Sequence, residues 1–192
     1  MAKPHENHWK VAKRDFRYLK ETIDFGIEYT NDFDVELTGF SDSDWAGDPD
    51  DRKSTIGYGF SIGSGIMSWS SKKQPTVSLS PTDAEYKALC TATCEAIWLT
   101  RILEDVGEKQ KVPTIIQCHN QSSIKLENNP MYHAKSKHIE THYHFVREKI
   151  QSNEIDVLYC NTNDNAADIF TKPLGKAKFV ICRDKIGVVK VV

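Results

Sequence analysis

Residues 80–106 read SPTDAEYKALCTATCEAIWLTRILEDV, and the hydrophobic pattern of this stretch decides how the rest of the chain folds. Ser80 as N-cap, Pro81 at the first helical position and Asp83 near the positive end of the helix dipole predict a helix start. Residues spaced four and three apart then form a stripe that faces the core: Glu85, Leu89, Ala92, Ala96, Leu99 and Leu103. Only Glu85 in this stripe is not apolar, and a buried carboxylate costs several kcal/mol unless a cation or a hydrogen-bond donor compensates it.

Strand patterns precede this helix. Residues 34–42 alternate between apolar and polar side chains, 54–62 are rich in β-branched and aromatic residues, and 66–73 follow after a glycine-rich turn. Together these three segments predict a β-meander. Before them, residues 8–30 predict a basic lead-in helix and a short extended piece, with Gly26 as the helix stop.

Strands and a helix alternate after the long helix. Residues 112–118 predict a buried strand, 134–151 a helix and 154–160 another strand, so that the whole order is βββαβαβ. A meander followed by helix-separated strands implies an α/β fold. The sheet is expected to be mixed and five-stranded, with the last strands parallel to the first strand and with helices packed on the sheet. In such sheets, sites lie beyond the carboxyl ends of the central strands.

The composition limits the class of protein. The 192 residues suffice for one compact domain with terminal extensions, and 25 basic against 27 acidic residues leave no global field for a polyanion or a membrane. The five cysteines form no C-x-x-C pair and are expected to be buried thiols in a reducing compartment. No apolar run is long enough to span a bilayer, so an intracellular protein, cytoplasmic or nuclear, without a membrane partner is expected.

Acidic residues stand at three places where the fold would bring them to one edge. Asp42 ends the first strand, Glu85 opens the core-facing stripe, and Asp168 lies among apolar neighbours on a short helix. Each acid alone has an equally ordinary structural explanation, such as capping or a surface position. Together they predict a site for a hard divalent cation, because clustered carboxylate oxygens bind such ions. Two metal ions about 4 Å apart would clamp the attacking and leaving oxygens of a phosphodiester.

A histidine-rich stretch at 133–144 offers competing chemistry. His138 and His142 are one helical turn apart, but the glutamate of the zinc-protease pattern H-E-x-x-H would directly follow the first histidine, and here Ile139 does. A face that touches phosphates is favoured over a zinc site, with a merely solvated face as the alternative. The cations proposed for phosphate contact lie on or near this stretch and on the third strand: Lys72, Lys73, Lys135, Lys137 and Arg147.

The sequence resembles the ribonuclease H domain of copia-type retrotransposon polyproteins. The resemblance rests on FSDSDWAG, DDRKSTIGY, SWSSKKQ, DAEYKAL, KHIETHYHFVRE and AADIFTKPL, which occur in the order and spacing of that family. It implies three parts: residues 1–32 similar to the tail of a reverse transcriptase, 33–175 an RNase H-like domain, and 176–192 a C-terminal extension. The resemblance therefore covers essentially the whole chain.

The resemblance also implies an activity and its residues. The family's enzymes cut the RNA strand of RNA/DNA hybrids with four carboxylates and two magnesium ions, and three of these acids match Asp42, Glu85 and Asp168. The fourth is replaced, because the family's C-D-N-Q-S is C-H-N-Q-S here, which puts His119 at a carboxylate position. The residues expected to contact the hybrid are Asn120 and His138 together with the five cations named above.

The replacement by His119 weakens the expected activity. A neutral imidazole removes an anionic interaction of about 4 kcal/mol at 4 Å and an effective dielectric of 20, and magnesium disfavours nitrogen ligands whereas manganese accepts them. Asp44 and Asp83 are expected to point away and not to substitute. Three hypotheses follow: a protein that binds hybrid but cleaves it poorly, an active two-metal endoribonuclease with His119 as ligand, and a repurposed fold that acts through protein contacts alone. Besides RNA/DNA hybrid, the candidate partners are other nucleic acid and a host protein.

Overall fold

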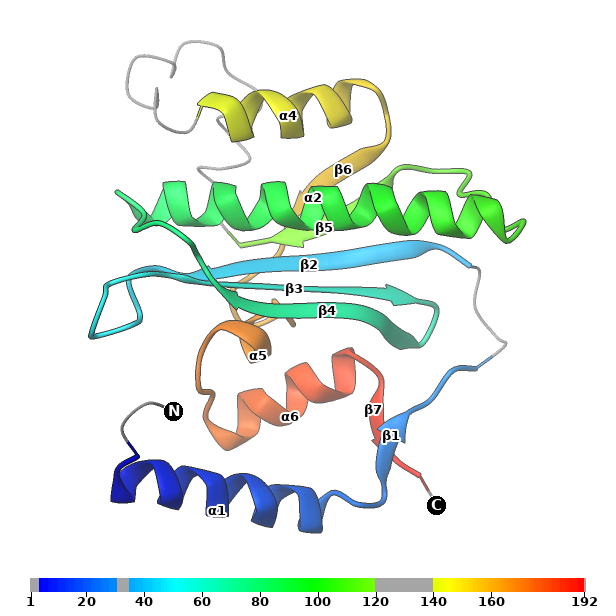
Figure 1. Ribbon diagram of the computed structural model, residues 1–192. Helices are drawn as coiled ribbons and strands as arrows, with labels where there is room; N and C mark the ends of the chain where they lie inside the picture. Colours follow the sequence, from blue (N-terminus) through cyan, green and yellow to red (C-terminus); the bar gives the residue numbers. More distant parts are fainter. Residues whose placement is uncertain (1–3, 31–34, 120–139, 192) are drawn as a thin grey trace.

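The computed structural model describes residues 4–30, 35–119 and 140–191. Its main sheet has five strands in the order β4-β3-β2-β5-β6 (Figure 1). The elements of this domain, in chain order, are β2 (Leu37–Asp44), β3 (Thr55–Ile62), β4 (Gly65–Lys73), α2 (Pro81–Asp105), β5 (Thr114–Cys118), α4 (Glu140–Gln151) and β6 (Ile155–Tyr159).

The strand directions confirm the predicted βββαβαβ order. β2, β3 and β4 form an antiparallel meander, whereas β5 runs parallel to β2, and β6 runs parallel to β5. The first strand continues two residues beyond the predicted end, to Asp44, because both Ser43 and Asp44 still pair with β3. The predicted helix 134–151 is described from Glu140 on.

Helices cover both faces of the sheet (Figure 1). α2 and α4 lie on one face, and the predicted stripe of α2 is buried there against the strands, Glu85 included. On the other face lies a smaller cluster of apolar side chains, from Ile66 of β4, Ala166 and Ile186. This second face carries the helices α5 (Asp168–Thr171) and α6 (Lys176–Lys185).

The two terminal segments of the chain pair with each other. The lead-in forms α1 (Glu6–Glu21) and β1 (Phe25–Ile27), and β1 pairs antiparallel with β7 (Val188–Lys190). The expectation that Gly26 stops the lead-in helix is wrong: the helix ends at Glu21, and Gly26 lies inside β1. The Tyr18 ring of α1 packs edge-on against Phe179 of α6, so both terminal segments lie over the same face of the domain.

The structure tests two expectations drawn from the composition: that the cysteines are buried thiols, and that no segment spans a membrane. All five cysteines are free thiols, and Cys118, Cys160 and Cys182 are buried as expected, but Cys94 is exposed on the outer side of α2. Among the helices of the described ranges, none combines the length and apolar character that crossing a membrane requires.

Candidate active site

Three chain segments bring acidic and imidazole side chains to one edge of the sheet. Asp42 lies near the carboxyl end of β2, His119 directly follows β5, and Glu85 belongs to the first turns of α2. β2 and β5 are parallel neighbours, so their carboxyl ends meet at the same edge. The capping of α2 by Ser80, whose side chain accepts from the Asp83 N–H, fixes where that helix starts and thus where Glu85 stands.

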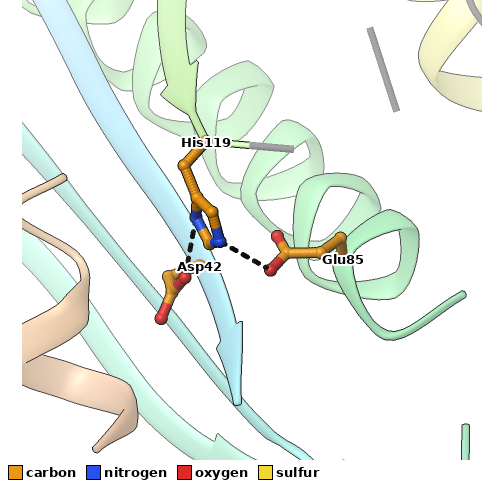
Figure 2. A group of neighbouring side chains, drawn as sticks. All are labelled: Asp42, Glu85 and His119. Carbon is orange, nitrogen blue, oxygen red and sulfur yellow. Dashed lines mark ion pairs between the residues drawn. The ribbon is translucent and has the colours of Figure 1, made fainter. Parts of the chain in front are cut away.

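The His119 ring lies between the two carboxylates (Figure 2). Its Nδ1 is 3.1 Å from Asp42 Oδ1, and its Nε2 is 3.7 Å from Glu85 Oε1. Each of the three residues offers one ligand atom, and these atoms lie within 4.8 Å of one another. Asp42 is fully buried and Glu85 is 6% exposed, whereas the His119 side chain keeps 23% of its surface in solvent.

The three groups shift one another's pKa values. Burial raises the pKa of Asp42, but the polar contact with His119 and the charge of Lys172 outweigh it and hold this pKa below its usual range. The contact with Asp42 raises the pKa of His119 against the effect of burial. Burial and the charge of Asp42 raise the pKa of Glu85 to about 8. At neutral pH the Asp42 carboxyl is therefore ionised, and the Glu85 carboxyl is mostly protonated.

Glu85→Gln is expected to change the pH dependence of stability. The pKa of Glu85 is raised by folding from 4.5 to about 8, so the folded state holds a proton that the unfolded state releases within this window. Stability therefore falls with rising pH, by at most about 1.4 kcal/mol per pH unit from this group. Urea unfolding without metal, at about pH 5 and about pH 8, should give a smaller difference for Glu85→Gln than for the wild type. An unchanged difference would contradict the raised pKa.

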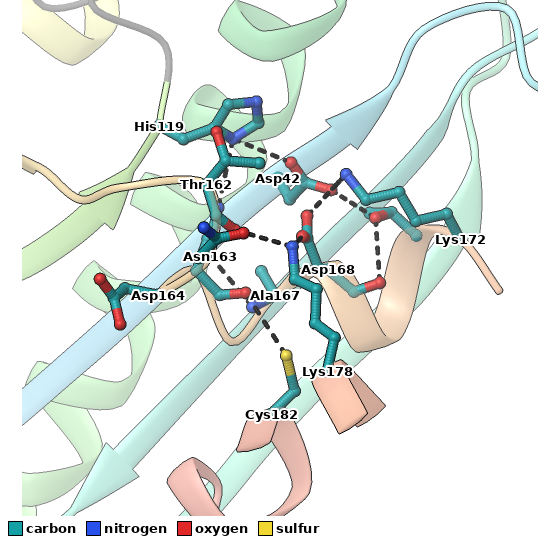
Figure 3. Close-up of polar contacts among 12 residues, drawn as sticks. Asp42, His119, Thr162, Asn163, Asp164, Ala167, Asp168, Lys172, Lys178 and Cys182 are labelled. Atoms are coloured by element: carbon teal, nitrogen blue, oxygen red, sulfur yellow. Dashed lines mark hydrogen bonds and ion pairs between the residues drawn. The ribbon is translucent and has the colours of Figure 1, made fainter. Parts of the chain in front are cut away.

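Asp168 lies beside this group, surrounded by lysines (Figure 3). It begins α5 and is fully buried, and it forms ion pairs with Lys172 and Lys178. Lys172 Nζ is 2.7 Å from Asp168 Oδ1 and 3.4 Å from Asp42 Oδ2, so one ammonium group joins the two acids. Burial lowers the pKa of Lys172, but both carboxylates outweigh it and raise this pKa, which keeps the ammonium charged.

Two further residues hold the site together and were not predicted from the sequence. The Asn165 side chain, fully buried, donates to Ser41 O at 3.0 Å, and its Nδ2 lies 3.4 Å from His119 Nδ1. Thr171 donates its hydroxyl hydrogen to Asp42 Oδ2. For Thr171 the signal was the motif AADIFTKPL, in which it follows Asp168 at helical spacing, whereas Asn165 precedes this motif and had no such signal.

The cations predicted to touch nucleic acid are placed differently from one another. Lys72 is exposed at the end of β4, whereas Lys73 forms ion pairs with Asp48 and Asp51. Arg147 of α4 lies over the Tyr143 ring, 6.0 Å from its centroid. The remaining predicted contact residues lie outside the described residues: Asn120, Lys135, Lys137 and His138.

Asp44 and Asp83, the two aspartates considered as substitutes for the missing carboxylate, do not join the site. Asp83 accepts from Leu79 N and pairs with Lys87 Nζ at 3.0 Å, and the Asp44 carboxylate turns toward Gly47. The group of described residues that could share a cation therefore consists of Asp42, Glu85 and His119.

These three residues fit a divalent metal ion. Oδ1 of Asp42 is buried and receives no well-aligned hydrogen bond from the described residues, although the His119 ring is within ion-pair distance. Two carboxylates and one imidazole form a mixed oxygen and nitrogen donor set. Such a set favours manganese over magnesium, which prefers oxygen ligands alone.

The chain is similar in sequence to transposon polyproteins, although no protein-family model matches it. It is 41% identical over 191 residues to a retrovirus-related Pol polyprotein from transposon RE2 of Arabidopsis thaliana, which is 100% of this chain and 13% of that protein. It is also 41% identical over 187 residues to that from transposon TNT 1-94 of Nicotiana tabacum, 97% of this chain and 14% of that protein. The chain thus spans only about a seventh of these relatives' length.

Solved structures with a similar fold include ribonucleases H. LC11-RNase H1, isolated from compost, matches with a TM-score of 0.56 and 16% identity over 71% of this chain and 93% of that one. The same enzyme in complex with an RNA/DNA hybrid matches with a TM-score of 0.53 and 13% identity over 71% and 94%. These likenesses confirm the predicted RNase H-like fold.

Proposed function

Because close homologues of this chain over its whole length are retrovirus-related Pol polyproteins of copia-type transposons, we propose that it is the RNase H part of such a polyprotein. In this proposal it binds RNA/DNA hybrid and hydrolyses the RNA strand poorly. Residues 33–175 form the RNase H-like unit, 1–32 correspond to a reverse-transcriptase tail, and 176–192 form an extension. The complex of LC11-RNase H1 with a hybrid supports this choice of substrate.

The observation that carries the proposal is the position of His119. Its ring occupies the place between Asp42 and Glu85 where the resemblance expects a carboxylate, and its pKa is raised. A protonated ring there adds positive charge next to the ligand oxygens, and a neutral ring offers one nitrogen instead of two oxygens. Both forms disfavour magnesium at this site.

The residues of the site have two kinds of role in this proposal: some would bind the metal ion, and others position the acids. Asp42, Glu85 and His119 would hold a divalent ion, which when bound supplies charge stabilisation and an activated water for phosphodiester hydrolysis. Thr171 fixes the Asp42 carboxylate by its hydroxyl group, and Asn165 ties the Asp168 segment to the backbone of β2. The raised pKa of Glu85 leaves a proton on this acid at neutral pH, which further lowers the negative charge available to a metal.

A second candidate function has one observation in its favour. The nitrogen and oxygen atoms of His119, Asp42 and Glu85 lie within 4.8 Å of one another, which suits a shared ion that accepts imidazole. In this alternative the protein is an active endoribonuclease with His119 as a metal ligand and manganese as its preferred ion.

A cleavage assay separates the two candidates. The RNA strand of a hybrid duplex is labelled at its 5′ end, and products are followed with magnesium and, separately, with manganese. The proposal expects binding of the duplex with little cleavage in magnesium, whereas cleavage in manganese at a rate typical of nucleases supports the alternative. Absence of hybrid binding under both conditions would contradict both.

Hybrid binding is expected to be modest and sensitive to salt. The chain has a formal charge of −2, so attraction depends on a few local cations such as Lys72 rather than on a global field. Each phosphate neutralised by a lysine or arginine adds about 0.9 to the slope of log affinity against log salt. Fluorescence anisotropy between about 50 and 200 mM salt should give a slope that Lys72→Met reduces by roughly one. An affinity that does not depend on salt, or equal affinity for an unrelated acidic polymer, would contradict groove recognition.

A further inference from the structure

Two cysteines of α2 form a pair of neighbouring thiols outside the candidate active site. Cys90 and Cys94 are four residues apart, and residues at this spacing are neighbours on the surface of a helix. Both are free thiols; Cys94 is exposed and Cys90 is half-buried. Their side chains are hydrogen-bonded to each other. The pair therefore offers two sulfur atoms in contact, one of them open to solvent.

The pair offers two ligand atoms and not more. Among the described residues, no third histidine, cysteine or acidic side chain lies close enough to the sulfurs of Cys90 and Cys94 to share an ion with them. The adjacent Glu95 is engaged toward the sheet, where its carboxylate accepts from Ser68 Oγ at 2.5 Å and from the Tyr58 hydroxyl at 3.4 Å. Structural zinc sites take four ligands, so two sulfurs alone do not suit zinc.

A direct disulfide does not fit the spacing of this pair. Residues four apart on a helix have their Cβ atoms about 5–6 Å apart, whereas a disulfide brings its two Cβ atoms to about 3.5–4.5 Å. A single atom inserted between the sulfurs lengthens the bridge, because two bonds to sulfur, each about 2.3 Å long for zinc, replace one S–S bond of about 2 Å. The pair can therefore hold a bridging atom while α2 stays helical.

The protonation of the thiols limits the chemistry of the bridging atom. Burial, and then the neighbouring Cys94 thiol, raise the pKa of Cys90 to about 12. A divalent metal ion binds thiolates, so it would have to release the thiol protons at neutral pH. An organic arsenoxide, in which trivalent arsenic carries one carbon substituent and one oxygen, reacts with two protonated thiols instead. Its oxygen takes up both protons and leaves as water, so no thiolate has to persist.

We propose that Cys90 and Cys94 form a two-sulfur binding site for trivalent arsenic, supplied as an organic arsenoxide. The arsenic–oxygen double bond and two S–H bonds break, two arsenic–sulfur bonds form, and one water molecule leaves. Arsenic stays trivalent, so no oxidant or reductant is needed. Glu85 belongs to the buried stripe of the same helix, whereas Cys94 is exposed, so the arsenic site is separate from the catalytic acids. The inference does not depend on the proposed function.

The site is tested by titrating the full chain, reduced with a phosphine, with phenylarsine oxide. Native mass spectrometry of the intact protein is expected to show one adduct per chain, with the mass of the reagent less one water. A one-sulfur adduct would keep the full mass of the reagent. Cys90→Ser and Cys94→Ser are each expected to bind at least about a hundredfold more weakly, because the second sulfur then no longer binds within the same molecule.

Two controls separate the pair from single thiols. Cys160→Ser removes a buried cysteine that directly follows β6 and should bind as the wild type does. Cys94→Ser combined with Thr91→Cys keeps the number of thiols but puts two of them at adjacent positions, which do not face each other, and should bind like the single variants. Far-UV circular dichroism verifies that each variant is folded. Alkylation of the exposed Cys94 with iodoacetamide makes the same test on the wild type without any substitution, and should abolish the two-sulfur adduct.

A wild type that gains no arsenic, or that gains it with the full mass of the reagent, would overturn the proposal. Equal affinity of the wild type and of the chain with the relocated thiol would do the same. The helical circular dichroism signal is expected to persist on binding, and its loss would mean that the bridge requires unwinding of α2. Formation of a Cys90–Cys94 disulfide by hydrogen peroxide, with the helical signal intact, would contradict the argument from spacing.

Discussion

His119→Asp is expected to raise magnesium-dependent cleavage of RNA in a hybrid by about a hundredfold to a thousandfold. The change removes a positive or neutral ring that lies 3.1 Å from Asp42 and restores an oxygen ligand with a negative charge. For unit charges at 4 Å and an effective dielectric of 20 the interaction is about 4 kcal/mol, which corresponds at most to about three powers of ten in rate. Initial rates on end-labelled hybrid under single-turnover conditions measure the effect.

The gain from this change must depend on the neighbouring acid. His119→Asp combined with Asp42→Asn should lose the gain, because both changes act on one metal site and cannot be independent. His8→Asp makes the same exchange on the exposed helix α1, away from the site, and should leave the rate unchanged. Equal cleavage in magnesium by the wild type and by His119→Asp would instead support the active enzyme with His119 as ligand.

Gly57→Ala is expected to lower the free energy of unfolding by about 2 to 3 kcal/mol. Gly57 of β3 pairs with Asp42 of β2, and a Cβ atom there would lie 2.5 Å from Cγ2 of Thr171 and 2.9 Å from Cβ of Phe170. The α5 segment therefore packs directly against the backbone of the strand next to Asp42. A methyl group forces this segment outward and carries Thr171 and Asp168 away from Asp42. Urea unfolding measures the loss.

The matched control is Gly175→Ala, where an added Cβ meets no atom within 4 Å. Gly175 is the N-cap of α6 with ordinary backbone angles, so alanine there should cost less than about 1 kcal/mol. Manganese titration should separate the two variants further, since only the first disturbs the segment that carries Thr171. Equal stability of Gly57→Ala and the wild type would mean that α5 shifts without cost and does not depend on this close approach.

Periodic features were predictable from the sequence. The α2 stripe and the meander are long repeating patterns, and they determined the sheet order and the edge at which Asp42 and Glu85 meet. His119 could be placed because it directly follows a strand that is apolar in the sequence. The positions of Asp42, Glu85 and His119 follow from the periodic patterns of their own elements and from the order of the strands in the sheet.

The polar partners of the site were not predictable in this way. Asn165 bonds to the backbone of β2 from a loop far along the chain, and Lys178 reaches Asp168 from a helix that the sequence presented as a mere extension. Neither residue lies on a periodic stripe, so only the packing of α5 and α6 on the sheet reveals its role. The pairing of β1 with β7 was missed for a related reason: strands of three residues carry no alternation to detect.

Because Lys178 lies late in the sequence, it is synthesised after the acidic residues of the site. Ribosomes add about 5–20 residues per second from the N-terminus, so Asp42 and Glu85 are made several seconds before Lys178. The β1–β7 pair forms only when β7, up to Lys190, has emerged. Every newly made chain therefore passes through a stage in which Asp168 lacks its second ammonium partner and Phe25 lacks the strand that pairs with it.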